Sequence, residues 1–154
     1  MLQAAVHALG EVLQFADHQA KLGALLFLLT SVEGLFIESF AVPTLGRSAR
    51  TLAAMSGVVL IALGLLWPRL KFGLAGARIA FCTLLYSTFA TLLIFVLAAI
   101  WGAGASIIPI AAQGARGSAT QEAILTAIAY TAGPTALVAF SLILWGLRGP
   151  PSTP

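Results

Sequence analysis

Four long apolar runs set the hydropathy pattern of the chain. They extend from Leu22 to Val42, from Arg50 to Trp67, from Ala77 to Trp101 and from Thr120 to Leu147. Each is close to the ~20 residues that a helix rising ~1.5 Å per residue needs to cross ~30 Å of hydrocarbon. The pattern therefore predicts an all-α fold, a four-helix transmembrane bundle that occupies residues 22–148.

The two flanking segments differ from this pattern. In residues 1–21, apolar positions recur every three or four residues between polar ones such as Glu11, Asp17 and His18. This spacing is typical of a helix on the membrane surface, so we expect an amino-terminal interfacial segment, with a frayed terminus as the alternative. The segment lacks the basic start of a signal peptide, so we expect it to be retained. Residues 149–154 are predicted to be a disordered tail.

Helix breakers and caps suggest where the spans begin and end. Pro43 is expected to end the first span, and Ser48 is a candidate N-cap for the second. Trp67-Pro68-Arg69 combines an aromatic anchor, a breaker and a charge, as expected where a span meets the membrane interface. Gly133-Pro134 predicts a kink in the middle of the fourth span.

Composition supports a membrane location for the whole domain. Of the 154 residues, 60% are hydrophobic and only 8% are charged, whereas roughly 25% of residues are charged in an ordinary soluble domain. The basic residues are spread over short connections, which excludes a nucleic-acid-binding patch. Cys82 is the single cysteine, so the chain can form neither an internal disulfide nor a thiolate metal cluster. We expect a multi-pass integral membrane protein whose partners are the membrane and other copies of the chain.

The distribution of basic residues predicts the topology. Four crossings place one set of basic residues on the side of both termini: Lys21, Arg69, Lys71, Arg78 and Arg148. The other side carries Arg47, Arg50 and Arg116. The positive-inside rule then places the termini in the cytoplasm. Small residues such as Gly57 and Gly64 exceed what four helices need among themselves, which favours contacts between subunits.

Two carboxylates lie at membrane depth in the first span. Glu33 is near its middle and Glu38 is near its outer end. A charge at this depth is costly, so each is expected to be functional, paired or protonated. Glu38 and Arg50 belong to consecutive helices and are predicted to form an ion pair, with a catalytic role as the alternative.

The third span contains a band of hydroxyl groups. Its members are Tyr86, Ser87, Thr88 and Thr91. Ser and Thr in such helices usually bond to their own backbone, whereas the phenol of Tyr86 can act as an acid or donor. Both histidines, His7 and His18, lie outside the spans, so no metal ligands are predicted in the bundle. Pattern alone leaves a channel or transporter subunit, an assembly factor or an intramembrane enzyme.

Several pieces of the chain, in order and spacing, resemble a known family. They are Gly23-Ala24-Leu25-Leu26-Phe27-Leu28-Leu29, Leu63-Gly64-Leu65-Leu66-Trp67-Pro68-Arg69-Leu70, Trp101-Gly102-Ala103-Gly104, Pro109-Ile110-Ala111-Ala112, Gly117-Ser118-Ala119-Thr120-Gln121-Glu122-Ala123 and Leu144-Trp145-Gly146-Leu147-Arg148. From Gly23 to Arg148 the chain resembles the membrane-bound hydroxylaminobenzene mutases, which are similar to the styrene oxide isomerases. The resemblance implies a four-helix intramembrane isomerase that forms a homo-oligomer, a trimer as in the styrene oxide isomerases.

The resemblance also implies haem b, held by a histidine at the start of the second helix. There the family has Ser-Ala-His followed by Asn-Gly, whereas this chain has Ser48-Ala49-Arg50 and Ser56-Gly57. The family's Tyr-Ala-Asn in the third helix is Phe89-Ala90-Thr91 here. Arginine stays protonated and cannot bind iron. Haem b is therefore possible by resemblance, although the expected ligand position is Arg50.

We interpret the chain as an isomerase or mutase for a small apolar or aromatic substrate that enters from the lipid phase. Arg50 is expected to stabilise a developing oxyanion, and Tyr86 or Glu33 is expected to donate the proton. The residues expected to bind the substrate are Ser56, Phe89, Thr91 and Glu38. The alternative is a non-catalytic membrane subunit or carrier that kept the bundle and lost the site.

Overall fold

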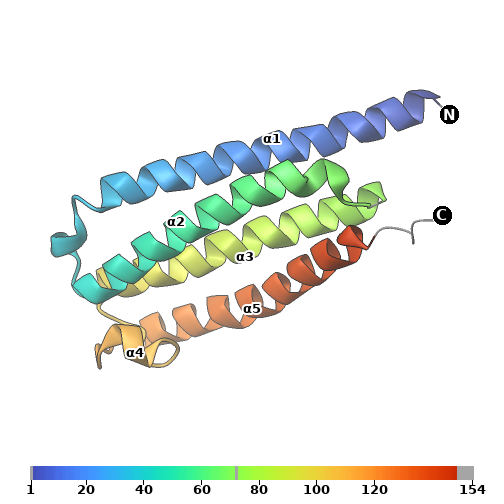
Figure 1. The fold of residues 1–154 in the computed structure, drawn as a ribbon. Helices are drawn as coiled ribbons and strands as arrows, with labels where there is room; N and C mark the ends of the chain where they lie inside the picture. Colours follow the sequence, from blue (N-terminus) through green and yellow to red (C-terminus); the bar gives the residue numbers. More distant parts are fainter. Residues whose placement is uncertain (1, 72, 149–154) are drawn as a thin grey trace.

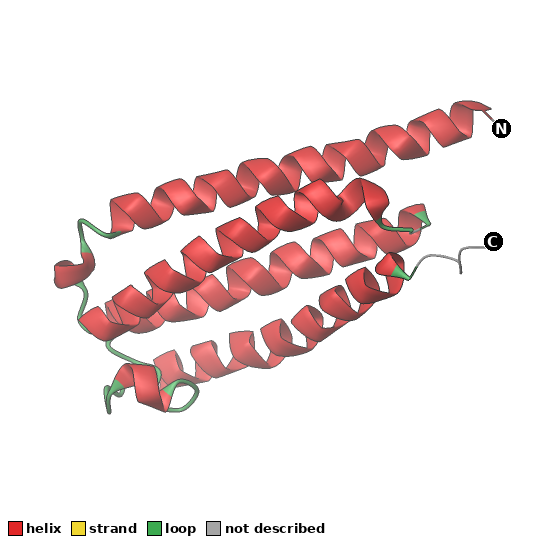
Figure 2. Ribbon diagram, in the orientation of Figure 1, coloured by secondary structure: helices red, strands yellow, loops and turns green. Residues whose placement is uncertain are grey.

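Four long helices lie side by side in the computed structural model, which describes residues 2–71 and 73–148 (Figure 1). They are α1 (Leu2–Glu33), α2 (Pro43–Leu66), α3 (Leu74–Trp101) and α5 (Ala119–Leu147). In the described residues the remaining chain forms short helices and loops, and no strand is present (Figure 2). The predicted all-α, four-helix architecture is confirmed.

The helices form a row in chain order rather than a closed square. The most extensive contacts join α1 to α2 and α3 to α5, while α2 and α3 form a lighter contact between these pairs. The two ends of the row are taken along the long axes of the helices. Residues 34–42 and 102–118 lie at one of these ends. The start of α1, the end of α5 and the α2–α3 connection lie at the other end (Figure 1).

Within the described residues, three helical stretches are long and apolar enough to cross a membrane. They are Pro43–Arg69, Leu74–Trp101 and Ala119–Leu147. Helix α1 is not one of them, because Glu11, Asp17 and Lys21 interrupt its first two thirds. Its apolar part packs along α2, so a crossing by α1 remains a prediction.

Helix α1 differs from the sequence expectation at both ends. It runs without interruption through residue 21, so residues 1–21 do not form a separate short helix. It also ends at Glu33, nine residues before the expected end of the first span. From Gly34 the chain turns and forms a single 3-10 turn, η1 (Ile37–Ser39). The predicted disordered tail, 149–154, lies outside the described residues.

Helix α2 begins earlier than predicted because Pro43 starts it instead of ending α1. Proline suits the first helical position, where its fixed φ fits the helix and its missing N–H is not needed. Ser48 is therefore not an N-cap and lies inside α2, where its hydroxyl donates to the carbonyl of Thr44 at 3.0 Å. At the other end a 3-10 turn, η2 (Trp67–Arg69), closes the segment where the sequence predicted.

A seam of small residues lets α1 and α2 approach closely. A Cβ atom added to Gly23 would lie 2.5 Å from the carbonyl oxygen of Gly57, and one added to Gly57 would lie 2.7 Å from that of Gly23. One added to Gly64 would lie 2.8 Å from the carbonyl oxygen of Ala16. Gly57 and Gly64 therefore serve packing within the chain, so they do not support the predicted contacts between subunits.

The connection between α3 and α5 is fixed by a carboxylate that the sequence did not single out. Glu122 accepts hydrogen bonds from the backbone N–H groups of Gly104 (2.8 Å), Ser106 (3.2 Å) and Gly117 (3.2 Å). These contacts tie the loop around α4 (Pro109–Ala112) to the first turn of α5. Helix α5 then continues through Pro134, with the curvature visible in Figure 1.

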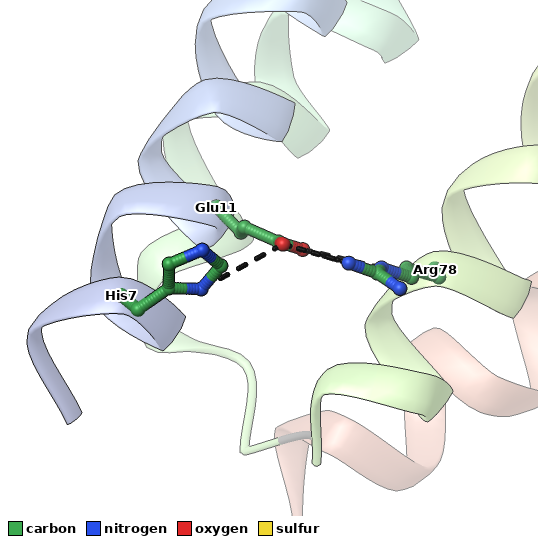
Figure 3. Close-up of polar contacts among 3 residues, drawn as sticks. All are labelled: His7, Glu11 and Arg78. Atoms are coloured by element: carbon green, nitrogen blue, oxygen red, sulfur yellow. Dashed lines mark hydrogen bonds and ion pairs between the residues drawn. The ribbon is translucent and has the colours of Figure 1, made fainter. Parts of the chain in front are cut away.

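An ion pair joins α1 to α3 at the end of the row where both chain termini lie. Arg78 donates to both oxygens of Glu11 at 2.7 Å, and His7 Nδ1 lies 3.8 Å from one of them (Figure 3). Close to this end, Trp67 is almost fully buried against Phe81. These contacts hold α1 in line beside the apolar helices.

Candidate functional site

A groove opens between α2 and α5 because both helices pack against α3 but not appreciably against each other. We call it the hydroxyl groove. It has a volume of about 270 Å³ and is lined by Leu52, Met55, Ser56, Val59, Ser87, Thr88, Thr91, Ala136 and Phe140. A cavity of about 150 Å³ suffices for benzene. The groove therefore has room for a small aromatic molecule arriving from the lipid.

The polar groups of this groove divide into two kinds. Thr91 donates its hydroxyl proton to the carbonyl of Ser87 at 2.7 Å, and Ser87 donates to that of Leu84 at 3.0 Å. Both hydroxyl groups can therefore only accept a hydrogen bond from a ligand. Ser56 and Thr88 make no side-chain hydrogen bond within the described residues, so their hydroxyls can donate. The structure thus brings Ser56 and Thr91, two predicted binding residues, into one groove.

Two further hollows continue around the same side of α2. The central groove, of about 480 Å³, is lined by Arg47, Ser48, Thr51, Leu52, Met55, Phe95 and Ala111. The arginine cleft, of about 360 Å³, is lined by Ile37, Arg47, Arg50, Thr51, Ala54 and Met55.

The central groove lies between the other two hollows, as their shared residues show. It shares Leu52 and Met55 with the hydroxyl groove, and it shares Arg47, Thr51 and Met55 with the arginine cleft. Met55 lines all three hollows and is 64% exposed. Met55 therefore marks the place where the three hollows meet.

Arg50, a predicted catalytic residue, lines the arginine cleft, and its charge reaches Glu33, a second predicted catalytic residue. Glu33 is the last residue of α1, and its Oε1 atom is buried without a hydrogen-bond partner among the described residues. The positive charge of Arg50 acts on this carboxylate, although the two groups do not form a direct ion pair. A cation beside a carboxyl group with an unused oxygen is an arrangement suited to proton transfer next to developing negative charge.

The predicted ion pair between Glu38 and Arg50 is wrong for the described residues. Glu38 lies exposed on η1 and forms no ion pair there. The reason is the early end of α1, which puts Glu38 on a turn. The Arg50 side chain extends instead to Gly34, where an added Cβ atom would lie 3.0 Å from the guanidinium carbon.

Tyr86 and Phe89 lie on the opposite face of α3 from the hydroxyl groove. With Leu93 and Ile128 they line a separate hollow of about 410 Å³ between α3 and α5. The phenol oxygen of Tyr86 lies 2.7 Å from the hydroxyl of Thr131. The sequence grouped Tyr86 and Phe89 with Thr91, but a rotation of about 100° per residue separates them. The helical periodicity of the sequence could have shown that Tyr86 and Phe89 lie on a different face of α3 from Thr91.

The residues present do not fit a histidine-ligated haem at the start of α2. Arg50 occupies the position that the resemblance assigns to the ligand. His7 lies near the start of α1, beside Glu11, and His18 lies near the middle of α1, 2.7 Å from the carbonyl of Gln14. In the described residues no group of three His, Cys, Asp or Glu side chains could hold a metal ion. No chemical step is therefore assigned to haem.

Comparisons with known proteins identify the relatives of this chain. Over 132 residues it is 39% identical to hydroxylaminobenzene mutase HabB of Ectopseudomonas oleovorans. This match covers 86% of this chain and 80% of the relative. It is 36% identical over 125 residues to hydroxylaminobenzene mutase HabA of the same organism, covering 81% and 93%. No solved structure matches the chain.

The family comparison covers most of the described helices. The sequence model of the styrene oxide isomerase family matches residues 15–148, which include most of α1 and all of α2, α3 and α5. This family and the three apolar helices together indicate an integral membrane protein. The chain belongs to the styrene oxide isomerase family and is an isomerase.

Proposed function

We propose that the chain rearranges a small N-hydroxylated aromatic amine to an aminophenol within the membrane. The observation that carries this proposal is the continuous line of hollows that shares Met55 and joins the hydroxyl groove to Arg50, whose charge acts on Glu33. The names of the two relatives, both hydroxylaminobenzene mutases, support this substrate class. Family membership favours an enzyme over the non-catalytic alternative.

The reaction needs only groups that this site can supply. The N–O bond breaks, a C–O bond forms at the ring, the ring carbon loses a proton and the nitrogen gains one. Substrate and product are isomers, so neither an oxidant nor a reductant is consumed. One group that first gives and later takes a proton is sufficient, and a carboxyl group can do both.

The lining of the hollows suggests where each part of the substrate lies. The ring would occupy the central groove, whose apolar residues include Leu52, Met55 and Phe95. The N–OH group would then point to the arginine cleft, where Arg50 offsets negative charge on the departing oxygen. Glu33 would give that oxygen its proton. Phe95 can offset the positive charge left on the ring.

Turnover by the purified protein in lipid nanodiscs tests the substrate class. Hydroxylaminobenzene should yield aminophenol, detected by liquid chromatography. Benzene, which has the same ring without the N–OH group, should remain unchanged. Styrene oxide is the second probe, because the matching family is named for its isomerisation. Conversion of styrene oxide alone would replace the hydroxylamine proposal with an epoxide-to-carbonyl rearrangement.

We also propose the predicted orientation and a homo-oligomer. Arg69 and Lys71 lie in the α2–α3 connection, Arg78 lies near the start of α3 and Arg148 follows α5, all towards the end of the row where α1 starts and α5 ends, and the positive-inside rule favours the cytoplasm for that end. Reporter fusions after Lys71 and after Arg148 should therefore report the cytoplasm, and a fusion after Arg116 the opposite side. The trimer is supported by the family resemblance alone and is tested by the mass of the detergent-solubilised protein.

A further inference from the structure

Arg47 is the residue whose charge the proposed reaction leaves unused. It lines both the central groove and the arginine cleft, three residues before Arg50 on α2. Residues three apart are neighbours on one face of a helix. The hydroxyl of Thr51, which lines the same hollows, donates to the carbonyl of Arg47 at 3.0 Å and so fixes this turn of the helix.

No carboxylate of the described chain is paired with Arg47. The ion pairs found there join Glu11 to Arg78, Asp17 to Lys21 and, through an imidazole, His7 to Glu11. All lie on or against the first two thirds of α1. At the end where Arg47 lies, the charge of Arg50 acts on Glu33, Glu38 is exposed without an ion pair, and Glu122 accepts hydrogen bonds from backbone N–H groups.

Arg47 is exposed near the start of α2, and an arginine near the end of a span extends its guanidinium to the membrane interface. There it can pair with a ligand that supplies the opposite charge. Apart from Arg50 and Thr51, the other residues of the cleft, Ile37, Ala54 and Met55, are apolar. The cleft therefore suits a ligand in which an oxyanion is attached to an apolar body.

We propose that Arg47 binds an oxyanionic group of an amphipathic ligand. Two sources of this group have the same chemistry: a ring carboxylate on an aromatic substrate, or the phosphate of a membrane phospholipid. Arginine favours both because its planar guanidinium can donate two parallel hydrogen bonds to two oxygens. The carboxylate source rests on the proposed function, since it makes the substrate a hydroxylaminobenzoate; the phospholipid source does not.

Binding measured without turnover separates this inference from the proposed function. Para-aminobenzoate, in excess over its dissociation constant, should raise the melting temperature of the wild type by about 2–4 °C, whereas neutral aniline should not. Arg47→Gln should abolish the shift. Arg116→Gln is the matched control, because Arg116 is exposed at the same end of the row and does not line the cleft. If turnover fails on every substrate but this shift persists, the anion site stands without the proposed reaction.

A kinetic measurement and a lipid-binding measurement identify the source of the anion. For a substrate carboxylate, Arg47→Gln should lower the ratio of kcat/KM for hydroxylaminobenzoate over hydroxylaminobenzene by about tenfold. For a phospholipid, native mass spectrometry should show about fivefold less retained phosphatidylglycerol in Arg47→Gln than in Arg116→Gln. Either result supports an oxyanion site at Arg47. Equal behaviour of both variants in the shift, kinetic and lipid measurements would overturn it.

Discussion

The guanidinium of Arg50 lies against the backbone of Gly34, in the turn that follows α1. A Cβ atom added to Gly34 would fall 3.0 Å from both the central carbon and one nitrogen of this group. Glu33 precedes Gly34 directly, so the contact also holds Arg50 near the Glu33 carboxylate. The early end of α1 thereby creates the charged end of the candidate site.

Gly34→Ala tests whether this contact positions Arg50. The new methyl group should displace the guanidinium by a few tenths of an ångström, because the end of a long side chain moves more easily than backbone. We expect kcat/KM on the preferred substrate to fall about threefold to tenfold with little change in melting temperature. Gly10→Ala is the control, since a Cβ atom there meets nothing within 4 Å. Equal activity of the two variants would contradict the positioning role.

Arg50→Met separates a functional arginine from a structural one. Arg50 is exposed and forms no ion pair within the described residues, so its loss should leave the melting temperature nearly unchanged. If it stabilises charge on the departing oxygen, turnover should fall about 10²-fold or more. Glu38→Gln, an exposed position without an ion pair, should affect neither property. A strong loss of stability in Arg50→Met would show that the residue is structural.

Gln19→Leu should stabilise the protein. Gln19 is fully buried, and neither its amide oxygen nor its nitrogen has a hydrogen-bond partner among the described residues. Burying an amide without partners costs ~1–3 kcal/mol. A leucine of similar size removes this cost, so thermal unfolding in detergent should show a higher melting temperature. A lower melting temperature would mean that the amide has a partner, such as an ordered water.

Gly57→Leu should disrupt the packing of α1 on α2. A Cβ atom at Gly57 would lie 2.7 Å from the carbonyl oxygen of Gly23, a backbone atom that cannot move aside alone. We expect destabilisation of about 3 kcal/mol or more, measured by thermal unfolding. Gly133→Ala is the control, because a Cβ atom there meets nothing within 4 Å. A well-folded Gly57→Leu protein would contradict the close approach of these helices.

The apolar helices could be predicted because their boundaries depend on local signals. Trp67 and Pro68 close α2, Gly102 in the left-handed conformation ends α3, and Ser118 caps α5 in a capping box. The end of α1 could not be predicted this way. Apolar residues continue past Gly34, so the hydropathy pattern did not show the break there.

The site was only partly predictable for a related reason. Arg50 and Glu33 were found because a charge near hydrocarbon is conspicuous in any sequence. The α3 residues were grouped as one band, although the rotation of a helix separates Tyr86 from Thr91. Arg47 was noted only as a charge that helps to set the topology, and Met55 carried no signal, because only the packing of α2 against its neighbours makes them line shared hollows.

The most direct test of the site asks which face of the helices the substrate uses. Met55 is shared by all three hollows and is largely exposed, so Met55→Trp should fill the passage without straining the core. Tyr86→Phe alters the opposite face of α3 and removes only the contact with Thr131. The measurement is turnover of hydroxylaminobenzene, or of the probe that the wild type converts, in nanodiscs. We predict that Met55→Trp loses at least about 90% of the activity while Tyr86→Phe keeps most of it. An active Met55→Trp beside an inactive Tyr86→Phe would contradict the site proposed along α2 and place the reaction between α3 and α5.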